Sequence, residues 1–349
     1  MKTLLLLIAA AAQTWAQPCP GFANCAYTVP KVSFAGQKSQ LTYTDRIGLP
    51  RTFEFYVRLP QVPGPLPVIV WAHGGGDGIQ TAGEGTLGQP SILTAQAGYL
   101  SISPAFRPRT DAEHKALCDF LESPGDAACG LINSPTWDRP YDIKALLDLL
   151  ETENRRQGSP LFGRVDMGRL AVGGHSAGSS GALSVAGAQR DFLGKHYGGV
   201  DFFEDVRPLA FVALSPSCPG QSYLFDTGYR NNETSWSFIE RPVISVTGAG
   251  DAHEQQPRGR RIGFDSMPAT GNKFLVWVDD VTFGHSDFGD EPCAAGRAKC
   301  APFEAVWSSS ILAFLDAYVL RKSPAIEYLS KGYMARAAGS AFEVEFSFK

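Results

Sequence analysis

The chain of 349 residues has no surplus of basic side chains. Its 31 lysines and arginines are outnumbered by 35 aspartates and glutamates, which gives a net charge of -4. Binding to nucleic-acid phosphates needs clustered positive charge, so this balance argues against a nucleic-acid partner. Charged residues of both signs make up only 19% of the chain and hydrophobic residues 44%, so a folded core is expected and general disorder is excluded.

The sequence also lacks a hydrophobic run that approaches the ~20 residues needed for a membrane-spanning helix. Its apolar N-terminal run, Leu4–Ala12, follows an early lysine and precedes small residues. This order is typical of a secretory signal peptide. We expect residues 1–16 to be a signal removed after Ala16 or after Ala12, with a buried N-terminal helix as the alternative. Residues 17–349 would then form one secreted domain, extracellular or periplasmic, without a stable membrane anchor.

The seven cysteines fit an exported chain, because disulfides persist in oxidising compartments. Three pairs are close in sequence, which favours local bridges although spacing alone does not fix connectivity. These pairs are Cys19 with Cys25, Cys118 with Cys129, and Cys293 with Cys300. Cys218 remains and is expected to be a buried free thiol.

Strands and helices alternate along the chain. Residues 40–44 and 52–58 alternate apolar and polar side chains and predict two antiparallel strands, and the continuous apolar run Val68–Ala72 predicts a strand buried on both faces. Further strands are expected at 99–104, 170–173, 209–214, 242–247 and 273–278, and helices at 141–153, 179–188 and 306–320. Pro140 and Asp142 suit the first turn of the first helix. The alternation predicts an α/β protein with a mostly parallel sheet and helices on both faces.

Some stretches match no regular element. Residues 17–40 are expected to be an irregular entry segment, 105–139 and 215–240 to be long ordered loops over the site, and 330–349 are assigned to no element. Aromatic residues of the two loops could line an apolar substrate pocket or pack the loops onto the core, and the sequence favours neither use. The substrate-binding candidates among them are Phe106, Trp137, Tyr223 and Trp236.

Gly174 to Gly178 read Gly-His-Ser-Ala-Gly and match the pattern G-x-S-x-G. The motif follows a predicted strand and precedes a predicted helix, which is the setting that a nucleophilic serine on a sharp turn requires. Glycines are needed there because side chains would collide with the neighbouring backbone. We therefore expect Ser176 to be a nucleophile, and the alternative is a small-residue turn.

His73-Gly74-Gly75-Gly76 follows the strand at Val68. Glycines at the carboxyl end of a strand allow backbone N–H groups to face a ligand and to stabilise an oxyanion. We expect Gly75 or Gly76 to supply one N–H donor and Ala177, the residue after the serine, to supply the other. The alternative is a flexible glycine turn.

An acid and a base are expected after the serine, in that order. Asp251 and His285 each follow a predicted strand, at the sheet edge where open α/β sheets hold their sites. The rival histidines His114, His196 and His253 fit the order or the spacing less well. Alternative acids are Asp279, Asp280 and Asp226.

Metal and cofactor motifs are missing. The chain has no H-E-x-x-H, no paired C-x-x-C and no phosphate-binding G-x-x-x-x-G-K. Gly83–Gly88 matches G-x-G-x-x-G but lies well past the preceding strand, so we interpret it as a chance match. We expect neither a metal nor a cofactor.

With these motifs the sequence resembles the α/β-hydrolase family of secreted serine esterases. Two further segments, Arg139–Ile143 and Gly284–Phe288, are similar to the branch of dienelactone-hydrolase-like proteins, platelet-activating factor acetylhydrolases, chlorophyllases and cutinase-like polyesterases. The triple glycine is more like the hormone-sensitive-lipase branch. The resemblance implies an α/β-hydrolase fold, a triad of Ser176, His285 and Asp251, and hydrolysis of a small-molecule or polymeric ester through an acyl-enzyme. Acyl transfer, peptide cleavage and non-catalytic binding on this fold are the alternatives.

Overall fold

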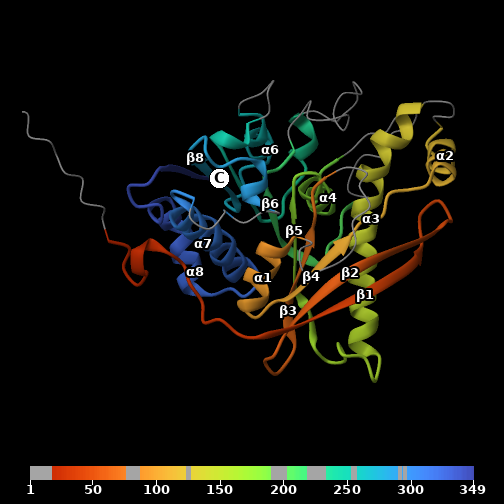
Figure 1. The fold of residues 1–349 in the computed structure, drawn as a ribbon, viewed down its shortest axis with the longest axis horizontal. Coiled ribbons are helices and arrows are strands. Elements are labelled where there is room, and N and C mark those ends of the chain that lie inside the picture. The colour runs from red at the N-terminus through yellow and green to blue at the C-terminus, as the bar shows by residue number, and fades with distance from the viewer. Residues whose placement is uncertain are drawn as a thin grey trace, which may run out of the picture.

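A computed structural model describes residues 18–75, 87–122, 127–189, 203–217, 233–252, 258–289, 293 and 297–349. The described residues form one nine-stranded sheet with the strand order β1-β2-β4-β3-β5-β6-β7-β8-β9 (Figure 1). The expected signal segment, residues 1–16, lies outside the described residues.

The sheet is parallel in its centre and antiparallel at both edges. β1 pairs antiparallel with β2, β2 with β4, and β8 with β9. The six strands in between, β4, β3, β5, β6, β7 and β8, run parallel to one another. The strands are β1 Phe34–Thr44, β2 Pro50–Pro60, β3 Leu66–Ala72, β4 Leu100–Ala105, β5 Val165–His175, β6 Pro208–Leu214, β7 Val243–Gly248, β8 Lys273–Asp279 and β9 Glu343–Phe348. This arrangement confirms the predicted α/β class with a mostly parallel sheet.

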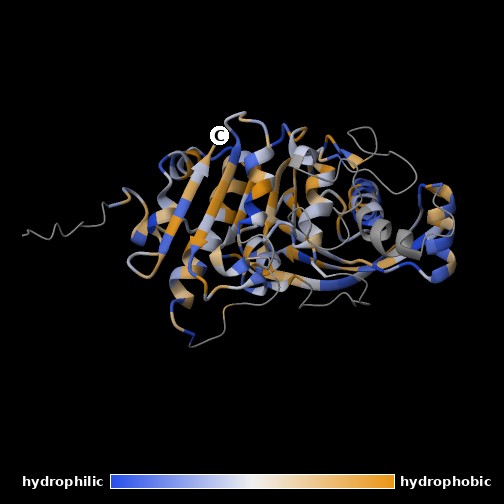
Figure 2. Cartoon of the chain, turned by 90° about the horizontal axis from the view of Figure 1, so that it is seen from above, coloured by the Kyte–Doolittle hydropathy of each residue, from blue (hydrophilic) through white to orange (hydrophobic). Residues whose placement is uncertain are grey.

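Helices cover both faces of the sheet, which explains the continuous apolar runs of the central strands. Their bounds are α1 Gly88–Gln96, α2 Asp111–Phe120, α3 Ala127–Arg155, α4 Ala177–Val185, α6 Ile262–Ser266, α7 Cys300–Tyr318 and α8 Ser323–Ser330. On β3, Ile69 and Trp71 pack in the cluster that contains α7 and α8, whereas Val68 and Val70 pack with leucines of α3. Figure 2 shows hydrophobic residues concentrated on the strands between these layers.

The expectation of a long irregular loop over residues 105–139 is wrong, because α2 and much of α3 occupy it. Thr110 caps α2 reciprocally with Glu113: the threonine hydroxyl accepts from the glutamate N–H, and the carboxylate accepts from the threonine N–H at 2.7 Å. Pro140 and Asp142 lie inside α3 and not in its first turn. Burial outweighs the local preference of proline here, since Trp137 and Asp142 are fully buried on this helix.

Both ends of the chain are more regular than predicted. The irregular entry segment ends where β1 begins at Phe34, and the unassigned tail contains β9 at the sheet edge. The ring of Phe346 on β9 stacks on Phe274 of β8 with ring centroids 6.0 Å apart. Residues of the tail therefore extend the hydrophobic core. A strand as short as β9 gives too little sequence pattern to predict this.

Two of the three expected disulfides are present in the described residues, Cys19–Cys25 and Cys293–Cys300. Cys118 is also disulfide-bonded, while the side chain of Cys129 and the whole of Cys218 lie outside the described residues. Disulfides of this kind indicate an oxidising compartment. No helix in the described ranges is long and apolar enough to cross a membrane.

Candidate active site

Ser176 occupies a strained turn between β5 and α4. Its backbone has φ 54° and ψ −125°, a conformation that side-chain-bearing residues adopt rarely and usually at functional sites. The serine N–H donates to the carbonyl of Leu214 on β6 at 3.0 Å, which fixes the turn against the neighbouring strand. The side chain is partly exposed at the carboxyl edge of the sheet.

The glycines around Ser176 are required by close backbone approach. A Cβ at Gly178 would collide with the carbonyl oxygen of Ala72 on β3, and one at Gly174 with the carbonyl of Gly178. A Cβ at Gly74 would lie 3.0 Å from the Cβ of Ser176. The glycine-rich segment after β3 therefore lies directly against the serine turn, as the two motifs together predict.

Asp251 and His285 meet at the same edge of the sheet. Asp251 follows β7 in a short 3-10 helix, His285 follows β8, and the Nδ1–H of His285 donates to Oδ1 of Asp251 at 2.9 Å. The Asp251 carboxylate is fully buried and also accepts from the hydroxyl of Thr247 at 2.7 Å. A buried carboxylate bonded to Nδ1 selects the imidazole tautomer whose Nε2 is free to accept a proton.

His175, the second residue of the G-x-S-x-G motif, connects the serine turn to the histidine turn. Its ring lies over that of His285 with centroids 4.5 Å apart, and its Nε2–H donates to the backbone carbonyl of His285 at 3.0 Å. Among the described residues, the hydroxyl of Ser176 makes no hydrogen bond to the ring of His285. Such bonds are often long before a substrate binds.

Sequence reasoning missed two residues that contact this pair. Arg260 is buried and places Nε 2.7 Å from Oδ1 of Asp251, while its Nη1 donates to the carbonyls of Ser215 and Pro216. The hydroxyl of Ser215 lies 2.5 Å from Nδ1 of His285, and its backbone has φ 44°. Neither residue belongs to a spaced motif, so only the folded chain reveals them.

The pKa of His285 is lowered from its ordinary value of 6.5. Burial is the main cause, because desolvation penalises the imidazolium form, and electrostatic interactions with His175 and Arg260 lower the pKa further. The hydrogen bond that His285 donates to Asp251 raises the pKa but does not compensate. The ring is therefore neutral, and able to accept a proton, over a wider pH range than an isolated histidine.

The segment after β3 is held by three hydrogen bonds. The N–H of Phe106 donates to Nε2 of His73 at 3.0 Å, and Nδ1–H of His73 donates to the carbonyl of Gly74 at 2.7 Å. The guanidinium of Arg139 on α3 donates to the carbonyl of Gly75. Gly75 is exposed with φ 78°, whereas Gly76 lies outside the described residues.

Ala177, the other expected donor residue, is the first residue of α4 and is partly exposed. The N–H groups of a helix's first turn have no partner within the helix, so this one is available to a ligand. Ala177 thus lies beside the glycine segment, in a position suited to bind negative charge.

The aromatic candidates for substrate binding are mostly covered by the rest of the chain. Trp137 is 0% exposed and packs with Leu117 and Phe203, and Trp236 is 1% exposed in the cluster that contains residues of α4. Phe106 is also buried, with its ring 5.0 Å from that of His73. These three residues pack against the core, and their use in substrate binding stays a prediction, as does that of Tyr223, which lies outside the described residues.

The rival residues lie elsewhere or outside the described ranges. His114 lies on α2, Asp279 is exposed at the end of β8, and Asp280 pairs with Lys299 at 2.7 Å. His196, His253 and Asp226 lie outside the described residues. Where the structure describes the chain, no group of three or more histidine, cysteine, aspartate or glutamate side chains could hold a metal ion.

Comparison with known proteins adds no assignment. No protein-family model matches the chain, and no curated protein sequence matches it. The functional argument therefore rests on the geometry of Ser176, Asp251 and His285.

Proposed function

We propose that the protein is a secreted serine hydrolase that cleaves carboxylic esters through an acyl-enzyme. The observation that carries the proposal is the hydrogen-bonded pair of Asp251 and His285 at the sheet edge where Ser176 occupies its strained turn. Nucleophile, base and orienting acid are the three roles that such a reaction requires.

Ser176 Oγ attacks the ester carbonyl while His285 Nε2 takes its proton. The carbonyl oxygen becomes an oxyanion, which the N–H groups of Ala177 and of Gly75 or Gly76 stabilise; one such donor typically lowers the barrier by about 3 kcal/mol. His285 then returns the proton to the leaving alcohol, and the acyl group stays on the serine. Water, activated by the same histidine, releases the acid. No cofactor is needed.

The strand order supports an α/β-hydrolase fold for this proposal. The serine follows β5, the acid follows β7 and the histidine follows β8, which reproduces the chain order of serine, acid and histidine in that fold. The disulfides, together with the apolar N-terminal sequence, support secretion. The substrate class we propose is a small-molecule or polymeric ester.

A fluorophosphonate probe tests the proposal directly. Such probes phosphonylate a serine only when a neighbouring base activates it, so we expect one adduct, and peptide mass mapping should locate it on Ser176. The same preparation should hydrolyse short p-nitrophenyl esters. A protein that neither reacts with the probe nor turns over any ester would instead be a non-catalytic binding protein.

The pH dependence of kcat/KM should carry the signature of His285. Below its pKa the ring is protonated and cannot accept the serine proton, so activity falls on the acid side. Because burial lowers the pKa of His285 from 6.5, we expect the midpoint of this fall below pH 6.5. A pH–rate profile from pH 4 to 8 with an uncharged ester measures it. A midpoint clearly above 6.5 would contradict the charge arrangement described here.

A further inference from the structure

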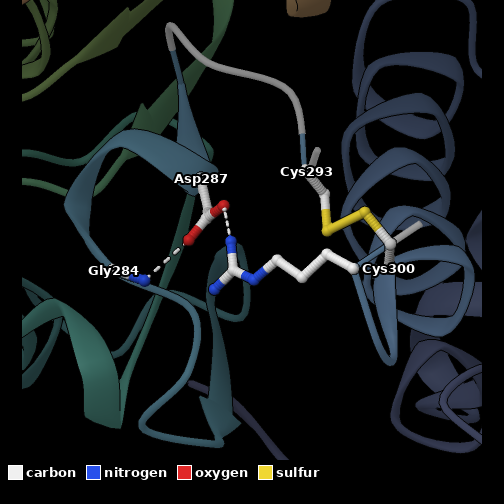
Figure 3. Close-up of a disulfide and its surroundings, with 5 residues drawn as sticks. Gly284, Asp287, Cys293 and Cys300 are labelled. Carbon is white, nitrogen blue, oxygen red and sulfur yellow. Dashed lines mark hydrogen bonds and ion pairs between the residues drawn. A yellow bond between two sulfur atoms is a disulfide. The ribbon is translucent and has the colours of Figure 1, made fainter. Parts of the chain in front are cut away.

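The Cys293–Cys300 disulfide lies beside the turn that carries His285. Figure 3 shows the carboxylate of Asp287, from that turn, facing an arginine guanidinium on the side of the disulfide. Cys300 is the first residue of α7, so the bridge connects residue 293 to the start of a helix that packs in the main core. The closed loop contains Arg297 and Lys299.

Arg297 reaches the histidine turn through Asp287. Its Nη1 donates to Oδ1 of Asp287 at 2.5 Å, and Oδ2 of the same carboxylate accepts from the N–H of Gly284 at 2.8 Å (Figure 3). Asp287 therefore bridges Arg297 and the residue that immediately precedes His285. The guanidinium also lies over the ring of Phe283, 5.0 Å from its centroid.

α7 holds the two ends of the same turn. The rings of Phe283 and Phe303 stack with centroids 4.2 Å apart, and the indole N–H of Trp307 donates to the carbonyl of Phe288 at 2.9 Å. A second ion pair from the disulfide loop, Lys299 with Asp280 at 2.7 Å, anchors the segment that leads into the turn. Contacts to α7, and to the residues that immediately precede α7, thus hold the chain on both sides of His285.

A pocket lies beside the middle of the turn. It has a volume of about 250 Å³, opens to the surface, borders Asp287 and is lined also by Cys293, Phe303 and Trp307. On this side Asp287 borders open space, and its ion pair with Arg297 holds the carboxylate in place. Surface ion pairs usually contribute little because ordering two long side chains costs entropy. Here the disulfide already restricts the loop that carries Arg297, and the Asp287 side chain is only 12% exposed.

We propose that Arg297, next to the Cys293–Cys300 disulfide, acts through Asp287 as a positioning residue for His285, so that this disulfide and this ion pair together form a clamp on the histidine turn. The inference rests on the proposed function, since it concerns how the general base is aimed at Ser176. A displacement of about 1 Å at such a base lowers turnover by roughly ten- to a hundred-fold. The clamp therefore affects the chemical step and not the affinity for substrate.

The matched test compares Arg297→Gln with Arg169→Gln. Arg169 forms an ion pair of the same length, 2.5 Å, with Asp166 on β5, far along that strand from Ser176. We expect R297Q to lower kcat for a p-nitrophenyl ester about tenfold. KM and the melting temperature should change little, and fluorophosphonate labelling should slow in parallel. R169Q should match the wild type in all four measurements.

A second comparison removes the bridge itself. The double variant Cys293→Ser/Cys300→Ser should reproduce the loss of kcat, whereas Cys19→Ser/Cys25→Ser removes a bridge of nearly equal span, six residues against seven, outside the histidine turn. The second double variant should keep the wild-type kcat per folded molecule, quantified by circular dichroism. If C293S/C300S does not fold, R297Q alone decides.

The outcomes separate this inference from the proposed function. An active wild type with R297Q equal to R169Q in kcat and in labelling rate overturns the clamp and leaves the hydrolase intact. A wild type without labelling at Ser176 overturns the proposed function itself. A loss of kcat in R297Q that comes with an equal loss of folded protein also overturns the clamp, because Arg297 would then serve stability alone.

Discussion

Replacing Ser176 by alanine is expected to lower kcat for a short p-nitrophenyl ester by about a million-fold, the scale at which removal of a serine nucleophile abolishes acyl-enzyme formation. The backbone at this position is strained, with φ 54°, but alanine keeps the same Cβ and adds no new strain. The variant should therefore fold normally and bind substrate with nearly unchanged affinity. Steady-state kinetics and a thermal melt measure both properties.

The control is a serine on α4, the helix that follows the turn of Ser176. Ser184 on α4 is buried and its hydroxyl donates to the carbonyl of Ser180 at 2.9 Å, so Ser184→Ala removes a hydroxyl without touching the turn. We expect S184A to retain nearly all of the wild-type kcat and S176A to retain only the small rate that oxyanion stabilisation and binding provide. Equal turnover by S176A and the wild type would refute the proposed mechanism.

The residues of the candidate site were predictable where chemistry imposes a local pattern. The motif around Ser176 and the strand-end positions of Asp251 and His285 can be read from the sequence, because they depend on turn geometry and on strand periodicity. Arg260 and Ser215 follow no such pattern. Their importance arises from contacts across the sheet edge, which exist only after β6, β7 and β8 have aligned.

The fold shows the same division. The buried parallel strands were predictable from continuous apolar runs such as Val68–Ala72, because a strand covered on both faces requires apolar side chains on both faces. The extent of α3 was not, because Pro140 predicts a helix start locally while tertiary packing continues the helix through it. Buried charge contributes to that packing: Arg51 of β2 contacts Asp142 of α3 at 2.7 Å, a pairing between residues far apart in sequence.

Asp251→Asn is expected to lower kcat by about ten-thousand-fold, because an amide that donates to Nδ1 selects the wrong tautomer of His285. Asp279→Asn is the matched control: Asp279 is exposed at the end of β8 and was one of the alternative acids in the sequence, so its amide should leave kcat unchanged. Loss of activity in D279N, with D251N active, would assign the acid to Asp279.

Asp251 also stabilises the fold through its ion pair with Arg260, and its effects on activity and on stability can be measured separately. Its fully buried carboxylate is a partner of Arg260, whose side chain is 5% exposed, so D251N removes a negative charge that lies 2.7 Å from a buried guanidinium. Breaking such a pair costs about 3–5 kcal/mol of unfolding free energy. The backbone carbonyls of Asp251, Ser215 and Pro216 still accept from Arg260, which places the expected cost near the lower limit. The double variant Asp251→Asn/Arg260→Met also removes the buried guanidinium, so denaturant unfolding should show that much of the lost stability is recovered while kcat stays as low as in D251N. Recovery of kcat together with stability would mean that Asp251 only maintains the fold and does not orient His285.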